Sequence, residues 1–192
     1  GNGALTNGTS SSNTAIGTSA MGNSTSANSN TAVCHEALKI IDDSTYNVAM
    51  GYNALGANTT ASENTGLGYR ALEANTTATD NTGVGYESLK SNTTGESNTA
   101  VGSVTLDANT TGDFNTAVGR SALGGNTTAD KNTGIGYNAL GSNSTGTQNV
   151  AVGALTLDAN TTGSSNTACG EGSLSANTTA SNNTAVGFQA LE

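Results

Sequence analysis

Apolar residues return at two positions of a 17-residue unit along almost the whole chain. Positions are counted here from the Asn of Asn98-Thr99-Ala100-Val101-Gly102, where the fourth position is apolar in every copy and the ninth is Leu or Met. The third position is Ala or Gly, and the fifth is Gly in every copy but one. From residue 13 to the end the register has no insertion. A period this regular indicates a repeat architecture, in which each short unit stacks on copies of itself.

The unit predicts short strands and turns rather than helices. Its two apolar positions do not form a stripe with a 3.6-residue period, and Gly and Asn recur inside the unit. Thr-Ala-Val predicts one β-type segment, and the stretch that ends in Ala-Leu predicts a second. A further turn is predicted at Asn-Thr-Thr. We therefore predict an all-β fold, a parallel β-solenoid or β-roll of about eleven 17-residue rungs.

The whole chain, residues 1–192, is interpreted as a single repeat array. Residues 1–12 form a partial first rung, residues 13–182 the full rungs, and residues 183–192 a partial last rung. The apolar columns at the fourth and ninth positions are expected to face inward. The predicted core is Val84, Leu89, Val101, Leu106, Val118, Leu123, Ile135, Leu140, Val152 and Leu157.

Asn occupies the first position of every copy and the twelfth position of most copies. Both columns are predicted to form turn corners, because Asn tolerates left-handed backbone angles, and their stacked amides can bond along the column. Gly at the fifth position suits a corner with positive φ. The predicted turn and ladder residues are Asn64, Asn81, Asn98, Asn115 and Asn132 at the first position, and Asn75, Asn92, Asn109 and Asn126 at the twelfth.

Two large apolar side chains per rung make a poor core for one chain. The free energy gained by burying these two side chains is smaller than the conformational-entropy cost of ordering a 17-residue rung. Cys34 and Cys169 lie too far apart in the array to add a disulfide within one chain. Pooling the apolar columns of several chains around one axis would remove the shortfall. The sequence therefore predicts a homotrimer, with a flattened single-chain solenoid as the alternative.

The formal net charge of −9 rests on a low content of charged residues, and the five basic residues are scattered. Such a chain has no surface to follow nucleic-acid phosphates, and no apolar run is long enough for membrane insertion. Phosphate loops, nucleophile elbows and paired-carboxylate motifs are absent from the sequence. We therefore expect a protein that is not an enzyme and uses no cofactor, and we interpret the start at Gly1 as that of a mature product or a fragment.

The unit Asn132-Thr-Gly-Ile-Gly-Tyr-Asn-Ala-Leu-Gly-Ser-Asn-Ser-Thr-Gly146 resembles the 17-residue repeats of long fibre proteins from phages, large viruses and bacteria. It is similar, more distantly, to the head repeats of trimeric autotransporter adhesins, whose shorter Asn-Ser-x-Ala-Ile-Gly units form a trimeric β-roll. The resemblance implies a structural rod in an extracellular, cell-surface or virion fibre, which extends or presents an adhesive surface. The implied partner is a further copy of the chain, in a homotrimer or a head-to-tail filament.

Three surface features leave a recognition function open, so an ice-binding or glycan-binding solenoid is the alternative to the fibre rod. The aromatic column of Tyr52, Tyr69 and Tyr86 could bind the faces of cell-surface sugars or simply stabilise the ladder. The pairs Thr93-Thr94 and Thr110-Thr111 would form rows of hydroxyl and methyl groups suited to ice, unless they are ordinary turn residues. The Asn-Thr-Thr triplets are also acceptor sequons for N-linked glycans, at Asn58, Asn75, Asn92, Asn109, Asn126, Asn160 and Asn177.

One copy, residues 30–46, departs from the pattern because Cys34 replaces the Gly of the fifth position. Adjacent strand residues point to opposite faces, so Cys34 and His35 are badly placed to act together as a nucleophile and base. A metal site is conceivable at His35, Glu36, Asp42 and Asp43. We prefer a degenerate repeat, or a lateral contact through Ile40 and Ile41, and predict no metal site.

Overall fold

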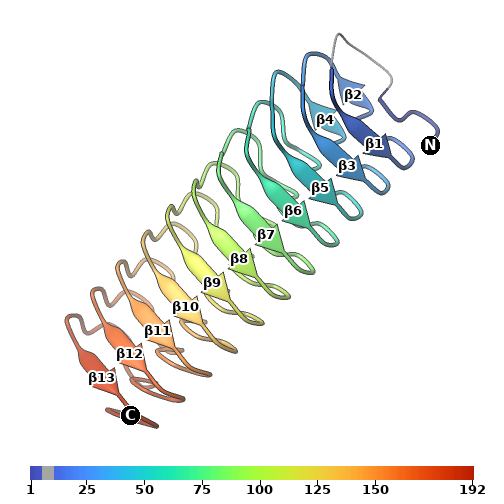
Figure 1. Ribbon diagram of the computed structural model, residues 1–192. Helices are drawn as coiled ribbons and strands as arrows, with labels where there is room; N and C mark the ends of the chain where they lie inside the picture. The colour runs from blue at the N-terminus through green and yellow to red at the C-terminus, as the bar shows by residue number, and fades with distance from the viewer. Residues whose placement is uncertain (6–10) are drawn as a thin grey trace.

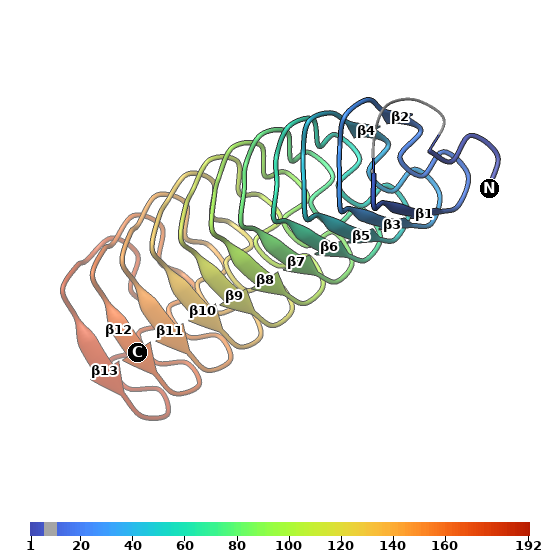
Figure 2. The same cartoon turned by 45° about the horizontal axis from the view of Figure 1, so that its top comes forward.

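The computed structural model describes residues 1–5 and 11–192. The chain winds into a rod of stacked coils, with the N-terminus at one end and the C-terminus at the other (Figure 1). Successive coils each add one short strand to the same side of the rod (Figure 2). The described residues contain no helix. The prediction of an all-β parallel β-solenoid is confirmed.

The strands of the long sheet have three residues each and all their pairs are parallel, in the order β1-β3-β5-β6-β7-β8-β9-β10-β11-β12-β13. Their bounds are Thr14–Ile16 (β1), Thr31–Val33 (β3), Val48–Met50 (β5), Thr65–Leu67 (β6), Thr82–Val84 (β7), Thr99–Val101 (β8), Thr116–Val118 (β9), Thr133–Ile135 (β10), Val150–Val152 (β11), Thr167–Cys169 (β12) and Thr184–Val186 (β13). A second, two-stranded sheet pairs β2 (Asn23–Ser24) with β4 (Ile40–Ile41). Thr99 pairs with Thr116 and Val101 with Val118, so one sequence repeat is one coil of the solenoid.

Left-handed backbone turns the chain at the fifth position, where the sequence predicts a positive φ for Gly, and at three further positions of the repeat. In one coil φ is positive at Gly119 (124°), Ser121 (58°), Leu123 (53°) and Lys131 (60°), and the same positions recur along the rod. The two Asn columns have no positive φ among the described residues, so the prediction that they form left-handed corners is wrong. The Gly column is required, since a Cβ on Gly119 would lie 2.6 Å from the carbonyl oxygen of Gly136 in the next coil.

The core contains the Leu column and the central residue of each strand, and it excludes the Val column. Leu89, Leu106, Leu123, Leu140 and Leu157 are fully buried, as are the strand-centre residues Ala100, Ala117 and Ala151. The core assignment of Val101, Val118, Ile135 and Val152 is wrong, because these side chains are 37–39% exposed, and Val84 is only partly buried. Space explains the reversal: a Cβ on the strand-centre Gly134 would already lie 3.2 Å from Leu123 Cγ. Only Ala or Gly fits between the sheet and the Leu column.

Both Asn columns are buried polar ladders that close each coil. Asn98 Nδ2 donates to the Gly112 carbonyl oxygen at 2.8 Å, and Asn109 Nδ2 donates to the same oxygen at 3.0 Å. Within each column, an Asn also bonds to the Asn of the neighbouring coil. The Asn98 backbone N–H donates to Asn81 Oδ1 at 2.9 Å, and Asn109 Nδ2 donates to Asn92 Oδ1 at 2.8 Å. No buried side-chain nitrogen or oxygen in the described residues lacks a partner. The amide ladders therefore stabilise the interior without leaving buried polar groups unpaired.

Candidate recognition surface

The outward side of the long sheet is a regular surface without charge. We call it the sheet face and define it as the first and last residues of the eleven strands from β1 to β13 that form the long sheet. The first residue is Thr in nine of these strands and Val in the other two, and the last residue is aliphatic or Cys. No residue of either column is charged. The face is thus a column of hydroxyl and methyl groups beside a column of apolar groups.

The hydroxyls of this Thr column differ from those of the Thr pairs that the sequence suggested for ice binding. In the pairs, Thr93 Oγ1 donates to the Thr110 carbonyl oxygen at 2.9 Å, and Thr110 Oγ1 donates to that of Thr127 at 3.0 Å. These hydroxyls serve the ladder, and only their neighbours Thr94 and Thr111 are exposed, on bends. By contrast, no hydroxyl of the sheet-face Thr column has a hydrogen bond within the described chain, Thr99 included.

The aromatic column forms a stack of rings. His35, Tyr52, Tyr69 and Tyr86 follow one another with ring centroids 5.3–5.5 Å apart and interplanar angles of 7–15°. A sugar platform offers the face of a ring to its ligand, whereas here the faces of Tyr52 and Tyr69 are covered on both sides by neighbouring rings. The geometry favours the interpretation that these rings stabilise the ladder.

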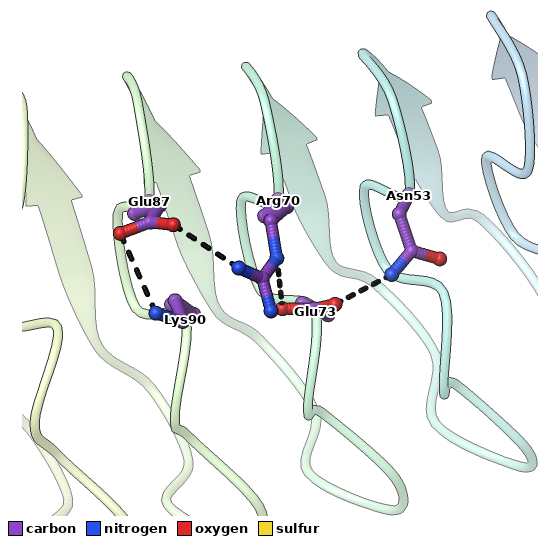
Figure 3. A network of polar contacts seen from close by, with 5 residues as sticks. All are labelled: Asn53, Arg70, Glu73, Glu87 and Lys90. Atoms are coloured by element: carbon purple, nitrogen blue, oxygen red, sulfur yellow. Dashed lines mark hydrogen bonds and ion pairs between the residues drawn. The ribbon is translucent and has the colours of Figure 1, made fainter.

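A network of charged side chains joins three consecutive coils (Figure 3). Arg70 lies 2.6 Å from Glu73 and 3.3 Å from Glu87, and Lys90 lies 3.4 Å from Glu87. Asn53 Nδ2 donates to Glu73 Oε1 at 2.6 Å. The hydrogen bond with Glu73 is the main cause of the raised pKa of Arg70. Every charge in this group has an opposite partner, and the pair between Arg70 and Glu87 joins two neighbouring coils.

The atypical copy does not assemble a metal site. Glu36 pairs with Lys39 at 2.9 Å, which lowers the pKa of Glu36, and Asp42 accepts hydrogen bonds from Thr25 and Ser26, which lower its pKa. In residues 1–5 and 11–192, no three His, Cys, Asp or Glu side chains gather as metal ligands would. Ile41 is buried in β4 while Ile40 faces solvent. Cys34 and Cys169 are exposed and unpaired, as their separation predicts.

Six of the seven predicted glycan acceptors are buried in the folded rod. Asn58, Asn75, Asn92, Asn109, Asn126 and Asn160 are fully buried, and Asn177 is partly buried. Each of their Nδ2 atoms, the atom that a glycan would modify, donates a hydrogen bond to the carbonyl oxygen three residues ahead. A glycan on any of these side chains would therefore break a ladder hydrogen bond of the folded rod.

The described surface has no cavity that could enclose a small substrate, and the described residues form no helix that is long and apolar enough to cross a membrane. Compared with known proteins, the chain matches no family model, no curated protein and no solved structure. The surface that the geometry of the rod distinguishes is the sheet face.

Proposed function

We propose that this protein is a structural rod of an extracellular or virion fibre, which extends or presents a surface at a distance. The observation that carries the proposal is the unbroken register of the rod: the same strand pairing and the same first-position Asn ladder repeat from coil to coil. In a solenoid each coil contacts only its neighbours, so length is added one repeat at a time. Stiff, extendable length is what a fibre needs.

Two further features support this proposal. The charged network and the ring stack both run along the rod axis and tie consecutive coils to one another. The repeat unit also resembles those of fibre proteins, which supports a location outside the cell, at its surface or on a virion. The sequence-based expectation that the protein is not an enzyme belongs to the same proposal.

The repeating unit of this fibre is a single chain in our proposal. The homotrimer that the sequence predicts, with the apolar columns of three chains pooled around one axis, is the alternative. One chain buries the ninth-position column from Met21 to Leu174 and fills the remaining interior with Ala and Asn. Small residues and amide ladders within each coil therefore support a rod made of one chain. Sedimentation equilibrium decides between one chain of 18.7 kDa and a trimer.

The rod function is tested by removing whole repeats. Deletion of residues 81–131 joins Asp80 to Asn132 in register and removes three coils. Electron microscopy should show a rod shorter by about 14 Å, since neighbouring strands lie ~4.8 Å apart, and the fibre that carries the chain should shorten while remaining assembled. The matched control deletes residues 81–128, which breaks the register and should prevent the ladder from closing. A fibre of unchanged length after the in-register deletion would refute the structural role.

A further inference from the structure

We propose that the sheet face binds the surface of ice. This goes beyond the rod function, since a fibre rod needs no particular chemistry on its sheet. Ice is a rigid ligand with a two-dimensional repeat, so a protein recognises it with a rigid array of comparable repeat. On the sheet face, strands ~4.8 Å apart carry outward side chains about 6.6 Å apart along each strand. Eleven strands repeat this spacing along the rod.

The side chains of the sheet face are held in position. Nearly all are β-branched Thr, Val or Ile, the exceptions being Met50, Leu67 and Cys169. A β-branched side chain has few χ1 rotamers, so its hydroxyl or methyl groups keep their place in the array. The Asn before each Thr is anchored in its ladder: the Asn115 backbone N–H donates to Asn98 Oδ1 at 2.9 Å, directly before Thr116. The array therefore presents a fixed pattern to its ligand.

The polar groups of the face are available to lattice water. A Thr hydroxyl donates one hydrogen bond and accepts two, and those of the sheet face use none of this capacity within the described chain. By comparison, the hydroxyl of Thr93, the first residue of a Thr pair, donates a hydrogen bond to a carbonyl oxygen of the next coil. Methyl groups and the neighbouring Val column exclude disordered water from the space between the hydroxyls. The absence of charge leaves no ion whose hydration shell would compete with the lattice.

A second copy of the chain fits this face less well than ice does. Over ten strand spacings of ~4.8 Å and a width of about 10 Å, the face covers roughly 500 Å², whereas a stable protein interface buries about 800 Å² on each partner. The apolar column is one residue wide, and its central members, such as Val118, are already about two-thirds covered by their own chain. Little apolar area remains for a protein partner to cover.

The test measures thermal hysteresis and the shaping of ice crystals by the purified full chain at millimolar concentration. Replacing Thr99→Tyr and Thr116→Tyr together places two bulky rings in the Thr column and should abolish both effects. The matched control, Thr94→Tyr with Thr111→Tyr, changes the exposed bends and should leave them intact. A third variant, Val48→Thr with Val150→Thr, completes the Thr column and should increase hysteresis. Circular dichroism and the length of the rod in electron micrographs show that each variant is folded.

Absence of hysteresis and shaping with the unsubstituted chain overturns the proposal, as does equal activity in the two Tyr variants. If the chain sediments as an oligomer that the sheet-face Tyr variant dissociates, the face is a contact between copies and ice binding is refuted. Each of these results leaves the rod function untouched, because the rod function depends on the in-register deletion instead.

Discussion

The first coils, residues 13–46, and the later coils, residues 47–182, close the same fold by different chemistry. In the later coils the twelfth position is a buried Asn that bonds to the Asn of the neighbouring coil, as Asn92 and Asn109 do at 2.8 Å. In the first coils that position is Ser24 or Ile41, also buried, and the backbones of β2 and β4 pair instead. Each coil thus needs a buried residue at the twelfth position and a hydrogen bond there to the neighbouring coil. Either an amide ladder or a backbone ladder can supply it.

The fifth position shows the same contrast between the two regions. The later coils all have Gly there, with φ between 124° and 142° in residues 51–187, whereas the first region has Gly17 with φ of 132° in one coil and Cys34 with φ of 101° in the other. A side chain at such an angle is strained, so the first region tolerates a cost that the later coils avoid. The comparison predicts that substitutions in the later coils are the more damaging.

The largest effect is expected from Gly119→Ala. The new Cβ would lie 2.6 Å from the Gly136 carbonyl oxygen, on a backbone with φ of 124°. Strain of about 1–3 kcal/mol is expected from the backbone angle, and a similar amount from the overlap. The reciprocal change, Cys34→Gly, should stabilise the first region by about 1 kcal/mol. Urea unfolding measures the free energy of unfolding of both variants. Equal shifts of the same sign would contradict the difference between the first and the later coils.

The next largest effect is expected from Asn109→Ala. The change removes two donated hydrogen bonds and leaves Asn126 Nδ2 without the Asn109 acceptor that lies 2.9 Å away. A buried polar group without a partner costs about 1–3 kcal/mol. Ile41→Val, at the same position of the first coils, should cost less, because the backbone pairing of β2 with β4 is kept and only one methyl group is lost. Hydrogen exchange of the neighbouring coils measures both, and an equal loss of protection would show that the two ladders do not differ.

Acid should affect the two regions in opposite directions. Burial raises the pKa of Asp158, so its charged form costs stability at neutral pH, and this cost disappears as the pH falls through the raised pKa. Hydrogen bonds from Thr25 and Ser26 lower the pKa of Asp42, so its contribution is present above the ordinary Asp pKa and is lost as the pH falls through the lowered value. Asp158→Asn should therefore raise the melting temperature at pH 7 and Asp42→Asn should lower it slightly.

Thermal melts of both Asn variants between pH 7 and pH 3 should show each difference from the unsubstituted chain shrinking as the Asp is protonated. A difference that does not depend on pH would mean that packing, rather than charge, is responsible.

The smallest effect is expected from Tyr69→Ala, which breaks the ring stack between Tyr52 and Tyr86. Aromatic pairs contribute about 0.5–1.5 kcal/mol each beyond the burial of their area. Tyr137→Ala is the matched control, because Tyr137 occupies the same position of the repeat but contacts Arg120 instead of another ring. Calorimetry should show the larger loss for Tyr69, and equal losses would mean that stacking adds nothing measurable.

The sequence predicted the period, the strand at Thr-Ala-Val, the requirement for Gly and the inward Leu column. It also identified both Asn columns, yet it assigned them to left-handed corners that Ser121, Leu123 and Lys131 form instead. Sequence reasoning missed the sheet-face Thr column, although its regular alternation with Val was visible. It preferred the Thr pairs because two adjacent Thr residues are more conspicuous than Thr and Val on either side of Ala.

The amino-acid sequence by itself determined that the chain forms identical coils in register, because an exact period lets every coil make the same contacts with the next. Only the tertiary structure decided which side of each strand faces inward. Alternation along a three-residue strand permits either Val outside or Ala outside, and hydrophobicity alone favours Val inside. The Leu column lies so close behind the sheet that Gly134 and its Ala counterparts alone fit there. Val is therefore left on the surface beside Thr, where it forms the face that we propose binds ice.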